Sequence, residues 1–84
     1  MSTSNYFTSA DQLPPQYRRL AAQNPIGAHV HVDDSDIDAG YNGTYEGHAV
    51  IIGYDINRYH TFLVITDQGA FYNHEVEILV PPTN

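Results

Sequence analysis

Apolar and polar residues alternate in short runs over residues 26–82, and this alternation predicts β-strands joined by tight turns. In the first run, Val30 and Val32 fall on one face, while His29 and His31 fall on the other. The pattern therefore predicts a mainly β domain. Five strands are predicted, at residues 28–32, 48–56, 59–66, 70–73 and 76–80.

The second predicted strand, residues 48–56, has the strongest strand signal and contains an internal glycine. Simple alternation divides its side chains into two faces: Val50, Ile52 and Tyr54 on one, and Ala49 and Ile51 on the other. Because glycine weakens the interior of a strand, Gly53 indicates a bulge or a sharp bend.

The remaining local signals predict turns and one helix. Asp67-Gln68-Gly69 is typical of a tight turn, and His74-Glu75 indicates a single 3₁₀ turn before the last strand. Residues 16–23 are good helix formers that follow Pro14-Pro15. The helix is expected to end at Asn24-Pro25, since the residue before a proline disfavours the helical conformation.

The order of these elements resembles a known class of fold. A glycine precedes the first strand, within the segment Ile26–Val32. This segment is followed by a long loop, a glycine-led strand (Gly47–Asp55), a third strand, an Asp-Gln-Gly turn and a terminal strand before Pro81-Pro82. This order is similar to that of SH3-like small barrels, including the KOW type, over about residues 26–82. Peptide-binding SH3 domains hold basic, proline-rich ligands with an acidic first loop and aromatic side chains, and KOW-type barrels often contact RNA or ribosomal protein. The chain lacks the tryptophan of the peptide-binding class.

The resemblance and the pattern together predict a mainly β fold, a five-stranded SH3-like small barrel with a short N-terminal helix. Residues 1–12 are expected to be a flexible N-terminal segment, because they are small and polar. Residues 13–25 are expected to form a helix in which Tyr17 and Leu20 cover one open end of the barrel. Residues 26–84 would be the barrel itself.

The charge is strongly acidic: ten aspartates and glutamates face three arginines (Arg18, Arg19 and Arg58), with no lysine and a net charge of −7. Phosphate contacts need cations, so this balance argues against direct binding to nucleic acid or an anionic membrane. It favours a basic protein surface as partner. The alternative is that the negative charge only keeps the protein soluble. The chain has no cysteine, no long apolar run and no secretion-signal pattern, so a cytoplasmic location is expected, in the host if the protein is viral.

The candidate partner-binding residues follow the first strand, in a loop rich in carboxylates and tyrosines. Tyrosine often anchors protein interfaces, because a rigid ring buries area at a low entropic cost. The alternative interpretation is that the tyrosines shield strand edges, with Tyr54 and Phe62 in the core. The expected binding set is Asp33, Asp34, Asp36, Asp38, Tyr41, Tyr45 and Glu46.

Two groups of residues have some features of a metal site, but we expect neither a metal nor another cofactor. Asp34, Asp36 and Asp38 have the spacing that opens a calcium loop, but Ala39 and Tyr45 stand where that loop needs glycine and glutamate. His29 and His31, with one of His48, His60 or His74, would supply nitrogen ligands. Histidines on the barrel surface are the favoured interpretation.

No nucleophile elbow or phosphate-binding loop is present in the sequence, so we expect no enzymatic activity. The favoured hypothesis is an acidic inhibitor or adaptor that docks on a basic surface, which could be a nucleic-acid channel. In style it resembles the small acidic counter-defence factors that phages encode. One alternative is an assembly subunit that forms a homo-oligomer through its sheet edges. The other is a nucleic-acid-associated SH3-like module that would need its three arginines to converge.

Overall fold

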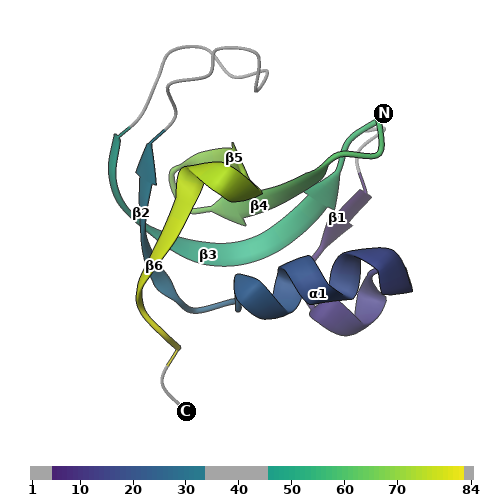
Figure 1. The fold of residues 1–84 in the computed structure, drawn as a ribbon, viewed down its shortest axis with the longest axis horizontal. Helices are drawn as coiled ribbons and strands as arrows, with labels where there is room; N and C mark the ends of the chain where they lie inside the picture. Colours follow the sequence, from purple (N-terminus) through teal and green to yellow (C-terminus); the bar gives the residue numbers. More distant parts are fainter. Residues whose placement is uncertain (1–4, 34–45, 83–84) are drawn as a thin grey trace.

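One long, curved strand organises the fold (Figure 1). In the computed structural model, which describes residues 5–33 and 46–82, β3 (Glu46–Ile56) runs through the middle of an antiparallel sheet. Its first half pairs with β2 (His29–Asp33) and its second half with β4 (Phe62–Thr66). The two ends of β3 therefore belong to different parts of the sheet.

The other strands extend this sheet at both sides. β5 (Gly69–Tyr72) pairs with β4, β6 (Val76–Val80) pairs with β2, and the resulting order is β5-β4-β3-β2-β6. The predicted mainly β class with a short helix is confirmed. The predicted closed barrel is wrong for the strands described, because β5 and β6 stand at the two ends of this order. Alternation reports which face of a strand is buried, and it does not report whether two edge strands pair.

A bulge in β3 changes which of its side chains face the core. The register moves from Ile51 opposite Thr66 to Gly53 opposite Ile65, so Ile52 is the extra residue. The bend expected at Gly53 is thus confirmed, but the predicted faces are wrong beyond it. Tyr54 is buried, while Ile52 is exposed, although simple alternation placed them together. An inserted residue reverses the alternation of every side chain that follows.

The helix α1 (Pro15–Gln23) has the boundaries that its prolines dictate. Pro15 occupies the first turn, where its missing N–H has no intrahelical partner to lose. Asn24 ends the helix, directly before Pro25. Ala21 is buried, and Tyr17 and Leu20 pack against the core, whereas the sequence predicted that these two side chains would cover one open end of a barrel.

The described part of the expected flexible N-terminal segment contains two elements that the sequence did not predict. The strand β1 (Asn5–Phe7) pairs with the last three residues of β3, and the 3₁₀ turn η1 (Ala10–Gln12) leads into α1. Phe7 is partly buried against the core. This segment is therefore attached to the sheet through backbone pairing.

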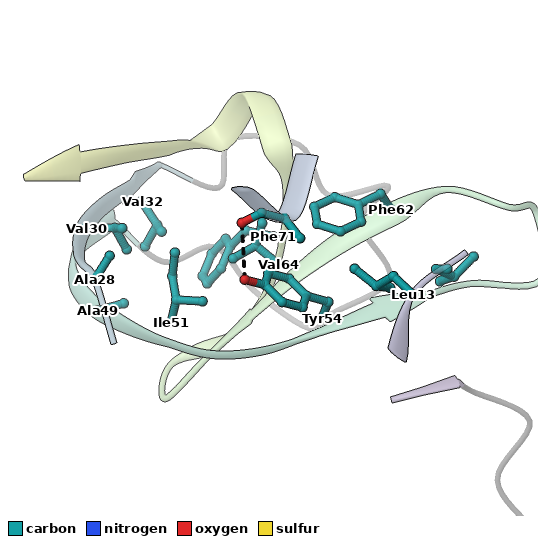
Figure 2. Close-up of a cluster of buried hydrophobic side chains, with 12 residues drawn as sticks. Leu13, Ala28, Val30, Val32, Ala49, Ile51, Tyr54, Phe62, Val64 and Phe71 are labelled. Atoms are coloured by element: carbon teal, nitrogen blue, oxygen red, sulfur yellow. Dashed lines mark hydrogen bonds between the residues drawn. The ribbon is translucent and has the colours of Figure 1, made fainter. Parts of the chain in front are cut away.

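The core lies between the curved sheet and α1. Figure 2 shows Tyr54 among the aliphatic and aromatic side chains that converge there. Its ring stacks on that of Phe62, with 5.5 Å between centroids. The most deeply buried large side chains are Tyr54, Phe71, Leu13, Ile51, Val30, Val32 and Val64.

Candidate binding site at the acidic end of the sheet

Two candidate residues face each other where β2 ends and β3 begins. Asp33 is the last residue of β2, Glu46 is the first of β3, and the two are directly opposite in the ladder. Both are exposed. Like charges directly opposite each other destabilise a sheet, so the fold carries an electrostatic cost at this position. The remaining predicted binding residues lie outside the described residues: Asp34, Asp36, Asp38, Tyr41 and Tyr45.

An open groove of about 370 Å³ begins beside Asp33. It lies between the end of β2, the 3₁₀ turn η3 (Asn73–Glu75) and the start of β6. Three acidic residues and two histidines are among the residues that line it. The lining residues are His31, Asp33, His74, Glu75, Val76 and Glu77.

Glu75 holds the floor of this groove in place. It is 7% exposed, and its Oε1 accepts a hydrogen bond of 2.8 Å from the backbone N–H of Tyr72. This bond closes η3 as a capping box, which confirms the 3₁₀ turn predicted before the last strand. His74 stacks on Tyr72, with 5.6 Å between ring centroids and 9° between planes. These two contacts hold the η3 side of the groove in place.

The sequence did not place Glu75 and Glu77 at any site, and it indicated His74 only as a possible metal ligand and not as part of the partner-binding set. They reach Asp33 only because β6 pairs with β2, which places Glu77 opposite His31 and Val76 opposite Val32. Local alternation carries no information on this pairing, since the two strands stand at opposite ends of the β region. The pairing itself is the signal that would have located the groove.

The outer face of β2 and β3 carries a histidine cluster next to the groove. His29 and His31 point outward while Val30 and Val32 are buried, as the alternation predicted. The Nδ1 atom of His29 lies 2.8 Å from Nε2 of His48 on β3.

His31 links this cluster to the acidic end of the sheet. Its Nε2 lies 3.7 Å from Oε2 of Glu46, and His48 is its direct partner in the ladder. Within residues 5–33 and 46–82, no group of three or more histidine, aspartate or glutamate side chains is positioned to hold a metal ion.

Two of the three arginines contact residues that are close to them in the sequence. Arg18 donates from Nε to the carbonyl of Leu13 at 3.1 Å. Arg58 donates to the hydroxyl of Tyr59 and lies 5.0 Å from the centre of that ring. These contacts use both guanidinium groups locally, and the groove is lined by no arginine.

None of the helices in the described part of the chain is long and apolar enough to cross a membrane. No protein-family model, curated protein or solved structure matches this chain. The candidate function consequently depends on the geometry and charge of the site alone.

Proposed function

We propose that this protein is a non-enzymatic, acidic protein-binding module, an inhibitor or adaptor that docks on a basic surface of a larger protein. One observation carries the proposal: the exposed Asp33 and Glu77 line a hollow of about 370 Å³ at the acidic end of the sheet, beside the buried Glu75. In the sequence, three further aspartates follow Asp33 before β3 begins: Asp34, Asp36 and Asp38.

A guanidinium or ammonium group is the ligand that this chemistry favours. Carboxylates bind arginine through charge-assisted hydrogen bonds, which are about twice as strong as neutral ones. The net charge of −7 would also steer a basic partner toward the protein before contact. A nucleic-acid-binding channel is one such surface, and the protein would then act as a nucleic-acid mimic. A phage-encoded counter-defence factor acting in the host cytoplasm is an example of this class.

We also propose that the fold is related to the SH3-like small β folds. The order β6-β2-β3-β4-β5 supports this, because consecutive strands β2 to β5 pair in turn while the last strand returns to the first of them. The 3₁₀ turn directly before β6 is consistent with it. The relation concerns the arrangement of strands, and the proposed partner follows from the charge of this chain.

The experiment is an affinity pull-down of the full chain at low and moderate salt. A basic partner should be captured at low salt and released as salt screens the charges. Replacing Asp34, Asp36 and Asp38 together by asparagine should abolish capture, and Glu77→Gln should weaken it.

The matched control is Asp11→Asn, which removes the same single charge as Glu77→Gln. Asp11 belongs to η1, and this element lies beside α1, away from the end of β2 and the start of β3 (Figure 1). Capture should be unaffected in this variant. A complex that survives the triple aspartate change would overturn the proposal. Equal weakening with Asp11→Asn and Glu77→Gln would show that general charge, and not this site, is responsible.

A second candidate function, an assembly subunit that forms a homo-oligomer, is favoured by β6. This strand is at one end of the sheet order, and it exposes Leu79 by 53% and Val80 by 49%. An edge strand with exposed apolar side chains can pair with a second copy. Sedimentation over a wide concentration range tests this: the mass should rise with concentration, and Leu79→Lys should reduce the rise. A constant monomer mass would exclude it.

A further inference from the structure

We propose that His29 and His48 form a surface site for a divalent transition-metal ion of the Cu²⁺ or Ni²⁺ class. The two side chains come from neighbouring strands and turn their ring nitrogens toward each other. This site lies on the outer face of β2 and β3, and it is separate from the docking function proposed above.

The distance between the two nitrogens fits adjacent ligands of a square or octahedral ion. The Nδ1 atom of His29 is 2.8 Å from the Nε2 atom of His48. Two nitrogens that are each about 2.0 Å from a metal lie about 2.8 Å apart when their bonds meet at a right angle. A tetrahedral ion such as Zn²⁺ needs about 3.3 Å for the same pair. Small rotations of two exposed rings would make their lone pairs converge on one ion.

The backbone holds the pair in this arrangement before any ion binds. His29 is opposite Val50 and His48 is opposite His31, so the two imidazoles are diagonal neighbours across the ladder. Diagonal neighbours lie within reach of each other when the side chains are long or aromatic. Their ring centroids are 4.9 Å apart. Ala49, the inward neighbour of His48, is fully buried, which fixes the strand beneath the pair.

Without a metal, the same two nitrogens form a hydrogen bond in which one ring donates and the other accepts. Each neutral imidazole carries one proton, which can reside on either of its nitrogens. To bind a metal, the ring that donates must move its proton to its far nitrogen, so that both facing nitrogens offer a lone pair. This change of tautomer releases no proton from a neutral pair, and the charge of the ion is added to the site.

The surroundings favour a cation and leave room for water. Both rings are exposed, so water molecules can complete the coordination that two protein ligands begin. His31 is opposite His48, and the carboxylate of Glu46 lies 3.7 Å from Nε2 of His31, so the same strands carry further donors. Glu77 adds a carboxylate from β6 opposite His31. The proposal requires two protein ligands only, which is consistent with the absence of any three-residue metal cluster in the described chain.

Titration of the untagged full chain with Cu²⁺, followed by calorimetry and by electron paramagnetic resonance, tests the proposal. We expect one tightly bound ion per chain with two coupled imidazole nitrogens. His29→Gln and His48→Gln should each weaken binding by at least about tenfold and remove one nitrogen from the spectrum, because each deletes a ligand.

His60→Asn is the matched control, because it removes a histidine from an exposed turn remote from β2. His60 has φ of +64°, a conformation that asparagine tolerates well. Copper binding should be unchanged in this variant. Equal weakening in His60→Asn, or unchanged binding in His29→Gln and His48→Gln, would overturn the proposal.

A second measurement separates a lost ligand from a damaged fold. Because an ion that binds the folded chain stabilises it, Cu²⁺ or Ni²⁺ should raise the thermal unfolding temperature of the wild type and of His60→Asn. His48→Gln should unfold at the wild-type temperature without metal, and added metal should produce no rise. A metal-dependent rise in His48→Gln equal to that of the wild type would contradict the site.

Discussion

The hydroxyl of Tyr54 donates a hydrogen bond of 2.7 Å to the backbone carbonyl of Asn24, which joins the middle strand of the sheet to the end of α1. The carbonyl of Ala21 lies 3.2 Å from the same hydroxyl oxygen. Tyr54 is 1% exposed, so these helix-terminal carbonyls are satisfied inside the core and away from water. The phenol of Tyr54 therefore anchors the end of α1 to the sheet.

Tyr54→Phe should lower the free energy of unfolding by about 1–3 kcal/mol, because it takes from the buried carbonyl of Asn24 the donor that Tyr54 supplies. Urea denaturation followed by circular dichroism measures the change. Tyr17→Phe is the control: its hydroxyl donates to the carbonyl of His60 at 3.0 Å in an exposed position, where water can replace it. A Tyr54→Phe cost no larger than that of Tyr17→Phe would contradict the role assigned to the buried bond.

Stability should also fall in strongly alkaline solution, and Tyr54 should account for part of this fall. Burial raises the pKa of Tyr54 above its usual value of 10.0, and a hydrogen bond from the backbone of Ile26 offsets this only in part. Above pH 10 the unfolded chain loses this proton while the folded chain retains it, so the stabilisation is complete below pH 10 and is lost as the pH rises further.

The measurement is urea denaturation of wild type and Tyr54→Phe from neutral pH to above pH 10. The difference in unfolding free energy between the two proteins should shrink as the pH rises, since the other tyrosines are common to both. A constant difference over this range would show that the protonation of Tyr54 is not coupled to folding.

Gly27 should tolerate no side chain. Its φ is +95°, and a Cβ built there would lie 3.2 Å from the Cβ of Pro82. Gly27→Ala should therefore destabilise the fold by more than about 1 kcal/mol, through backbone strain and crowding together. Gly69→Ala is the matched control, because Gly69 has φ of +132° but open space around the added methyl group. Thermal unfolding should show a larger loss of stability for Gly27→Ala than for Gly69→Ala. Equal losses would mean that Pro82 moves aside for the added methyl group at no energetic cost.

Local signals were sufficient for most of the fold. The five strands after α1 and the two ends of α1 were predictable, because alternation, turn residues and prolines act within a few residues. The buried Val30 and Val32 and the outward His29 and His31 followed from the same local rule. The strand β1 was missed because three residues in a polar segment carry no alternation that a prediction can use.

The candidate site was less predictable, because it depends on pairing between distant segments. The charge of Asp33 and Glu46 could be read from the sequence, but the groove needs η3 and β6 to return to β2. The His29–His48 contact needs a specific register between β2 and β3, in which a shift of one residue would separate the rings. To predict that Ile52 is exposed, one would have had to place the bulge at Ile52 itself.

The facing carboxylates of Asp33 and Glu46 lead to a prediction that links stability to binding. Glu46→Lys should replace a repulsive cross-strand pair by an attractive one, and it should stabilise the fold by about 0.2–1 kcal/mol at low salt. The lost contact with His31 at 3.7 Å would offset part of this gain. Urea denaturation at low and moderate salt measures the effect, which salt should reduce because both side chains are exposed.

The same substitution should weaken the capture of a basic partner, because it places a positive charge at the acidic end of the sheet. Glu46→Gln should give intermediate values of both stability and binding, since it removes the repulsion without adding an attraction. A gain in stability together with a loss of binding would explain why two like charges face each other at this position. The negative charge of Glu46 would then be needed for docking although it lowers the stability of the fold. Unchanged capture by Glu46→Lys would instead place the partner contact away from the β2–β3 end.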